Sequence, residues 1–173
     1  ESWLAVEAVL KEQDPSKNEI KYFSLDLSAK PEARIKIYWQ HRDITAEELE
    51  KMYSVARNYV PGDITEFCQA IADTTVLSKR PVISHFAFIE SDASVPNAAT
   101  FQLPVSSYAL NDASIKKRIE NYLISKNLPV PIYENSINSV ATRSLTTKNG
   151  IHSYVSFRRD KQKRPRVTAY LAV

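Results

Sequence analysis

The sequence predicts an α+β fold in which pairs of helices alternate with antiparallel two-stranded hairpins. Segments with polar–apolar alternation, typical of half-buried strands, occur in pairs along the chain. Segments with apolar residues at helical spacing lie between these pairs, and the whole pattern returns after about 66 residues. With 173 residues, of which 43% are hydrophobic, the chain can bury one core, so we expect a single domain over 1–173.

The chain begins with a predicted helix, or the end of one, that runs to about Gln13. Two strands follow, "EIKYFSLDL" over 19–27 and "ARIKIYW" over 33–39, and a turn at Pro31 joins them. Alternation in the second strand places cations and a tyrosine on one face and apolar residues on the other. The polar face holds Arg34, Lys36 and Tyr38, and the apolar face holds Ile35, Ile37 and Trp39.

Two helices are predicted next, over 44–60 and 63–77. At the start of each, a side-chain oxygen precedes a glutamate by three positions, which is the spacing of a capping box. The two pairs are Thr45 with Glu48 and Asp63 with Glu66. Pro61 and Gly62 mark the end of the first helix, because neither residue continues a helix well.

The same order of elements then returns, with Pro129 and Pro131 separating the two helices. The predicted elements are strands over 81–90 and 99–105, helices over 111–127 and 131–145, and a closing hairpin over 151–159 and 166–173. About three repeats of two helices and two strands are therefore present.

Residues spaced by 66 positions become equivalent in this repeat. The equivalent sets are Arg34, Thr100 and Arg166; Lys36, Gln102 and Thr168; and Tyr38, Pro104 and Tyr170. Hairpins in series, each followed by a helix pair, cover one sheet face with helices and leave the polar face free. The expected helix-facing set is Phe23, Leu25, Leu27, Ile35, Ile37, Trp39, Val155, Phe157, Val167 and Ala169.

About six strands in an open sheet would leave two unpaired edges, which proteins avoid. Closure into a barrel with a usable interior requires roughly eight to ten strands. We therefore expect either further repeats on another segment or association with a second copy of the chain.

Composition excludes several classes of function. Only two glycines are present where average usage would give about a dozen, and no glycine-rich phosphate loop occurs. Cys68 is the only cysteine and lies in a helical pattern, so we expect a buried, inert thiol and no disulfide. A net charge of +3 permits a nucleic-acid partner without requiring one, and we expect none. No apolar run approaches the length of a membrane span and no signal peptide is present, which favours a cytoplasmic protein without a membrane partner.

Three segments together carry a family resemblance: "DLSAKPEARIKIYW", "FQLPVSSYALNDASI" and "NGIHSYVSFRRDKQKRPRVTAYL". The chain resembles the C-terminal part of the dimethylallyltryptophan synthase family of aromatic prenyltransferases. The resemblance implies the ABBA prenyltransferase barrel, with five repeats of two helices and two antiparallel strands, helices outside, and an active site inside. This chain would then be the C-terminal portion of a ten-stranded barrel.

The resemblance also implies a reaction. A dimethylallyl group passes from dimethylallyl diphosphate to an indole, tryptophan or another aromatic acceptor, as in alkaloid biosynthesis and other secondary metabolism. Ionisation of the diphosphate requires preorganised cations, the allylic cation requires aromatic faces, and water has to be excluded. Because cationic side chains can replace a metal and no aspartate-rich motif is present, we expect no cofactor and no magnesium requirement.

On the family pattern, Arg34 and Lys36 match the basic pair that holds the diphosphate. Tyr38 matches the adjacent tyrosine, which also shields the cation. Tyr170 matches a shield tyrosine on the last strand. Tyr154 is expected to face the interior as well, because it shares its strand face with polar residues.

Three further positions depart from the family pattern but are still expected at the site. Thr100 stands at a shield position and Gln102 at a diphosphate position, where the family often has a glutamine or lysine and then a tyrosine. Arg166 occupies a place where a shield tyrosine is common, and it could instead bind the diphosphate.

The general base is expected outside this chain, because the first two repeats of the family supply it. Asp26 could point into the interior, although a structural role near the turn is the simpler interpretation. His85 and His152 lie in strands and are expected to be structural. The basic stretch 158–166 is expected to be a solvated turn. The alternative function is a non-catalytic half-barrel or a basic module that binds nucleic acid or another ligand.

Overall fold

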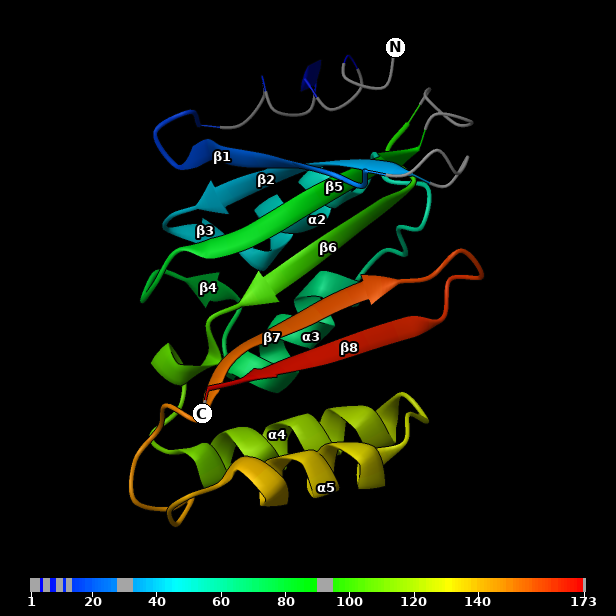
Figure 1. Cartoon of the computed structure of the whole chain (residues 1–173). Coiled ribbons are helices and arrows are strands. Elements are labelled where there is room, and N and C mark those ends of the chain that lie inside the picture. Colours follow the sequence, from blue (N-terminus) through cyan, green and yellow to red (C-terminus); the bar gives the residue numbers. More distant parts are fainter. Residues whose placement is uncertain are drawn as a thin grey trace.

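The computed structural model describes residues 4, 7, 8, 11, 14–27, 33–89 and 95–172. Over these residues, the chain forms a six-stranded antiparallel sheet in the order β1-β2-β5-β6-β7-β8, accompanied by helices α2 to α5 (Figure 1). The predicted combination of antiparallel hairpins and helix pairs is confirmed. The opening helix expected before Gln13 lies mostly outside the described residues, and the Pro31 turn lies wholly outside them.

All six strands of the main sheet match the alternating segments found in the sequence. Their bounds are β1 Asn18–Leu25, β2 Arg34–His41, β5 Val82–Ile89, β6 Ala98–Leu103, β7 His152–Arg159 and β8 Pro165–Leu171. β1 and β8 end the strand order and do not pair with each other within the described part of the chain. The sheet is therefore a partial barrel with two free edges.

Helix α2, Ala46–Tyr53, begins at the predicted capping box. The Thr45 hydroxyl accepts a hydrogen bond from the Glu48 N–H at 3.1 Å, and the Glu48 carboxylate accepts one from the Thr45 N–H at 2.7 Å. The helix is shorter than predicted because the following segment is tied to the sheet. Asn58 donates to the Arg159 carbonyl at 2.6 Å and accepts from the Ala99 N–H at 3.1 Å.

Replacing Thr45 with alanine should lower the free energy of unfolding by about 1 kcal/mol, because the Glu48 N–H loses its acceptor. Chemical denaturation monitored by circular dichroism measures the change. Thr45→Ser is the control, since it keeps the accepting oxygen and should retain most of the stability. Equal losses in the two variants would contradict a role for the cap.

Helix α3, Asp63–Ala72, departs from the prediction at both ends. The capping box of Asp63 and Glu66 is wrong, because Gly62, with φ of 85°, is the N-cap and gives no side-chain hydrogen bond. Glu50 of α2 replaces it by accepting from two N–H groups of the first turn, those of Ile64 at 2.7 Å and Thr65 at 3.0 Å. The residues predicted as its last turn instead form a small sheet with the chain before α2. The two strands of that sheet are β3 Ile44–Thr45 and β4 Val76–Leu77.

The second helix pair follows a short 3-10 turn, Val105–Ser107. Helix α4 spans Asp112–Ser125, and the side chain of its N-cap Asn111 accepts from the Ser114 N–H at 3.0 Å. Helix α5 spans Val130–Val140 and has a proline in its first turn, where a missing N–H is tolerated. The pair lies alongside β8, whereas α2 and α3 lie behind the middle of the sheet (Figure 1).

The apolar core lies between the sheet and the helices. Of the ten residues predicted to face the helices, six are buried or pack partly against the core: Ile37, Trp39, Val155, Phe157, Val167 and Ala169. The other four are exposed, namely Phe23, Leu25, Leu27 and Ile35. The prediction is wrong for these four, because among the described residues the core begins at Ile37 and includes no residue of β1.

Candidate active site

A cavity of about 630 Å³ lies on the sheet face opposite the core. Side chains from β2, β5, β6, β7 and β8 line it, together with the turn between β7 and β8 and Asp26 just after β1. Seven residues predicted for the site line this one cavity: Arg34, Lys36, Tyr38, Thr100, Gln102, Arg166 and Tyr170. The sheet curves so that side chains from five strands surround one space, as an active site requires.

Tyr154 is the predicted site residue that does not line the cavity. It lies directly opposite Tyr170 in the pairing of β7 with β8, so both side chains project from the same sheet face. The Arg80 guanidinium lies over the Tyr154 ring, 5.8 Å from its centroid. The Tyr154 ring therefore contacts Arg80 outside the cavity.

Strand register explains how distant parts of the chain converge. Tyr38 lies opposite His85, His85 opposite Thr100, Thr100 opposite Arg158, and Arg158 opposite Arg166. This row crosses five strands on one face, with neighbouring side chains about 5 Å apart. The row places two aromatic rings at one end of the cavity and two arginines at the other.

Arg34 and Lys36 of β2 form the first group of cations, and Asp26 lies between them. Arg34 Nε is 2.7 Å from Asp26 Oδ2, and Lys36 Nζ is 3.5 Å from Oδ1. The hydrogen bond from Arg34 and the charges of both cations lower the pKa of Asp26. Asp26 therefore stays ionised and neutralises one of the two positive charges, which leaves a net positive site.

Tyr38 is the centre of an aromatic cluster beside these cations. Its ring stacks on Tyr22 with centroids 4.4 Å apart and lies 4.7 Å from the His85 ring. Burial, with smaller contributions from Tyr22 and Tyr170, raises the pKa of Tyr38, so its hydroxyl remains protonated at neutral pH. Aromatic faces next to a group of cations suit a reaction that produces a carbocation beside an anion.

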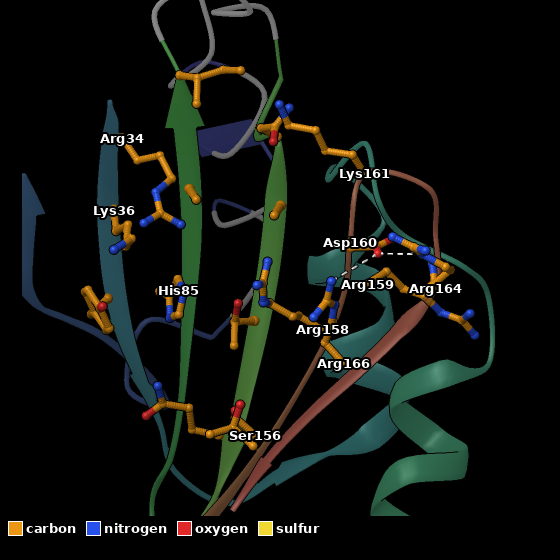
Figure 2. A pocket seen from close by; sticks show the side chains of 18 of the residues that line it. Arg34, Lys36, His85, Ser156, Arg158, Arg159, Asp160, Lys161, Arg164 and Arg166 are labelled. Atoms are coloured by element: carbon orange, nitrogen blue, oxygen red, sulfur yellow. Dashed lines mark hydrogen bonds and ion pairs between the residues drawn. The ribbon is translucent and has the colours of Figure 1, made fainter. Parts of the chain in front are cut away.

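The second group of cations comes from β7, the following turn and β8. Arg158 and Arg166 lie on the opposite side of the cavity from Arg34 and Lys36, with His85 between the two groups (Figure 2). Asp160 in the turn pairs with Arg164 at 2.8 Å and lies 3.7 Å from Arg166. The turn is thus held in shape by its own ion pairs.

The basic stretch 158–166 was expected to be a solvated turn, but two of its arginines have other places in the structure: Arg159 pairs with the helix layer and Arg158 lines the cavity. Arg159 donates two hydrogen bonds of 2.6 Å to the buried Asp63 of α3, which fixes β7 to the helix layer. The hydrogen bond with Asp63 raises the pKa of Arg159. Arg158, by contrast, points into the cavity and forms no ion pair with any residue that the structure describes.

Sequence reasoning placed two cavity residues elsewhere. Arg158 was assigned to the turn, although strand alternation puts it on the same face as Tyr154 and Ser156. His85 was assigned a structural role, although its register beside Tyr38 puts it at the cavity floor. Alternation gives the sheet face of each residue, and strand register then places His85 beside Tyr38 and Arg158 beside Arg166.

Two other candidates remain structural, as expected. His152 is fully buried and hydrogen-bonded to Asp112 and Tyr133 on the helix side of the sheet. Cys68 is buried in α3, and burial raises the pKa of its thiol, so it is a poor nucleophile. No helix within the described residues is both long and apolar enough to cross a membrane.

The chain is similar to solved structures of two dimethylallyltryptophan synthases. The structure of 6-dimethylallyltryptophan synthase from Micromonospora olivasterospora, in complex with DMASPP and Trp, matches 97% of this chain with a TM-score of 0.85 and 26% identity, over 49% of its own length. The structure of 5-dimethylallyltryptophan synthase from Streptomyces coelicolor matches 98% of this chain with a TM-score of 0.82 and 24% identity, also over 49% of its length. No protein-family model matches the chain.

The resemblance to the dimethylallyltryptophan synthase family is confirmed by these structures. The chain has the ABBA prenyltransferase fold, in the form of a barrel that is not closed. It spans about half the length of the enzymes that it matches.

Proposed function

We propose that this chain forms part of an aromatic prenyltransferase that moves a dimethylallyl group from dimethylallyl diphosphate to an indole or tryptophan-type acceptor. The observation that supports this most is the convergence of Arg34, Lys36, Tyr38 and Tyr170 in one cavity. The two solved enzymes described above share the fold, and one of them holds DMASPP and Trp.

In this proposal the two groups of cations bind the diphosphate. As the allylic C–O bond breaks, its electron pair passes to the diphosphate, and the arginine and lysine side chains stabilise the growing negative charge. The rings of Tyr38 and Tyr170 face the allylic cation and offer no strong nucleophile. The acceptor ring then attacks the cation, and loss of a ring proton restores aromaticity.

The proton acceptor for that last step is proposed to lie outside this chain. Asp26, the carboxylate at the β2 side of the cavity, is engaged by Arg34 and Lys36. A segment that pairs with the free edges of β1 and β8, either the remaining repeats or a second copy of the chain, would close the barrel and supply the base.

The test is an assay for dimethylallyl transfer, with dimethylallyl diphosphate and tryptophan as substrates and mass spectrometry of the product. It compares the chain alone with the chain assembled with its completing segment, in the presence of magnesium or of EDTA. We expect prenylated tryptophan only from the assembly, at the same rate with either additive. Failure of the assembly to prenylate tryptophan, indole or other aromatic acceptors would reject the proposal.

A basic module for nucleic acids is less well supported by the site. Arg159 is occupied by Asp63, and Arg164 and Arg166 lie near Asp160, so the turn offers few unneutralised cations to a phosphate backbone. The cations that remain converge on the cavity, on the sheet face opposite the core. A duplex would instead require a continuous exposed positive surface.

Replacing Asp26 with asparagine should strengthen binding of inorganic pyrophosphate by about two- to five-fold. Asp26 neutralises part of the charge of Arg34 and Lys36, and the anion competes with it for these cations. Isothermal titration calorimetry on the full chain measures the change. Asp14→Asn is the control, because Asp14 is exposed and caps a turn at Ser16, away from the cavity. Weaker binding by Asp26→Asn would contradict this arrangement.

A further inference from the structure

The cavity contains an ionisable side chain to which the proposed reaction gives no role. His85 lies at its floor on β5, between the two groups of cations (Figure 2). Its cross-strand neighbours are Tyr38 on β2 and Thr100 on β6, and Arg158 is one strand further. Any anion held by both groups of cations therefore lies against the His85 ring.

The ring of His85 is held in place before a ligand arrives. It lies 4.7 Å from the Tyr38 ring, and Tyr38 in turn stacks on Tyr22. Thr100 on the other side is buried. A side chain confined in this way loses little conformational freedom when it binds a ligand.

The two ring nitrogens have different surroundings. Nδ1 is buried and has no hydrogen-bond partner among the described residues. A buried N–H without an acceptor is more costly than an unpaired acceptor, so the proton belongs on Nε2 and Nδ1 keeps its lone pair. The neutral ring therefore has one donor, the Nε2–H, and one unpaired acceptor, Nδ1.

The charged groups around His85 keep the ring neutral. Burial, followed by the positive charges of Lys36, Arg158 and Arg34, lowers the pKa of His85 to about 4. Tyr38 and Thr100 contribute no charge at neutral pH, and Asp26 is paired with Arg34 and Lys36. Burial, the largest cause of the lowered pKa, persists when a diphosphate binds, and no acceptor becomes available to Nδ1, so the ring remains neutral in the complex as well.

We propose that His85 is a neutral hydrogen-bond donor of the anion site, whose Nε2–H binds a diphosphate oxygen alongside Arg34, Lys36 and Arg158. This inference rests on the proposed function, because it requires that the cavity binds a diphosphate. The donor needs no proton from solvent, and so its contribution stays constant between about pH 5.5 and pH 8. It also adds a donor of fixed direction to cations on long, flexible side chains.

Calorimetric titration of the full chain with inorganic pyrophosphate tests this role. We expect His85→Phe to weaken binding by about 10- to 100-fold, because a hydrogen bond to a charged group is lost. His85→Gln places an amide N–H near the position of Nε2 and should recover most of the affinity. Equal affinity of wild type and His85→Phe, measured where thermal unfolding shows both folded, would overturn the inference.

Nitrogen-15 NMR of the imidazole groups provides an independent measurement. The chain has three histidines, so the His85 signals are assigned by their loss in His85→Gln, with His41 and His152 as references away from the cavity. Pyrophosphate should shift the Nε2 signal of His85 while the proton remains on Nε2 from pH 5.5 to 8. A proton on Nδ1, or an imidazolium in the complex, would overturn the inference. Absence of pyrophosphate binding by wild type would reject this inference together with the proposed diphosphate site.

Discussion

Replacing Lys36 with alanine is expected to lower the rate of dimethylallyl transfer by about 100- to 1,000-fold, the usual effect of removing one preorganised donor from a developing anion. Lys36 lies on β2 with only 17% of its side chain exposed, and it points into the cavity beside Arg34. The effect should therefore appear in kcat as well as in the affinity for the diphosphate.

The measurement is steady-state prenyl transfer by the assembled barrel, together with pyrophosphate binding by the chain itself. Lys117→Ala is the matched control, because Lys117 is an exposed lysine on α4 outside the cavity. It should leave both quantities unchanged. Unaltered turnover in Lys36→Ala would remove the diphosphate role from β2 and with it the main support for the proposed function.

Most of the sheet could be predicted from local patterns. Alternation in segments such as 33–39 and 151–159 reflects one face in the core and one face in the cavity, so each hairpin is visible in the sequence. The spacing of Arg34, Thr100 and Arg166 by 66 positions gave the repeat. Local patterns fail where a distant residue decides the conformation, as at α3, where Glu50 provides the cap that Asp63 seemed to offer.

The candidate site shows the same limit. Arg34, Lys36 and Tyr38 lie on one face of a single strand and could be assigned to one site from the sequence. His85 and Arg158 join them only through strand register. Register depends on the pairing of whole strands, including the irregular step in β7 between His152 and Tyr154. That irregularity is not evident from alternation alone, and Tyr154 lies beyond the cavity while Tyr170 lines it.

A second large effect is expected away from the cavity, at a buried carboxylate that fixes the start of β7. Asp112 is fully buried at the N-terminus of α4. It accepts hydrogen bonds from the N–H groups of Ile151 at 3.1 Å and His152 at 3.0 Å, from His152 Nδ1 at 2.9 Å and from Arg143 at 2.6 Å. Burial lowers the pKa of His152, so its ring is neutral and its Nε2 accepts from the Tyr133 hydroxyl at 2.7 Å.

Replacing Asp112 with alanine should lower the free energy of unfolding by about 3–5 kcal/mol, because it leaves buried donors and the Arg143 guanidinium without an acceptor. Asp112→Asn keeps one carbonyl oxygen and should lose less, while Asp14→Ala in an exposed turn is the control.

Burial alone would raise the pKa of Asp112, but the hydrogen bonds from His152, Ile151 and Arg143 outweigh it and lower that pKa. A lowered carboxyl pKa stabilises the fold fully above its unfolded value of about 4, and this stability is lost as the pH falls through the folded pKa. Urea denaturation at pH 7 and near pH 3 should therefore show a smaller difference between wild type and Asp112→Ala in acid, and an undiminished difference there would contradict an ionised Asp112.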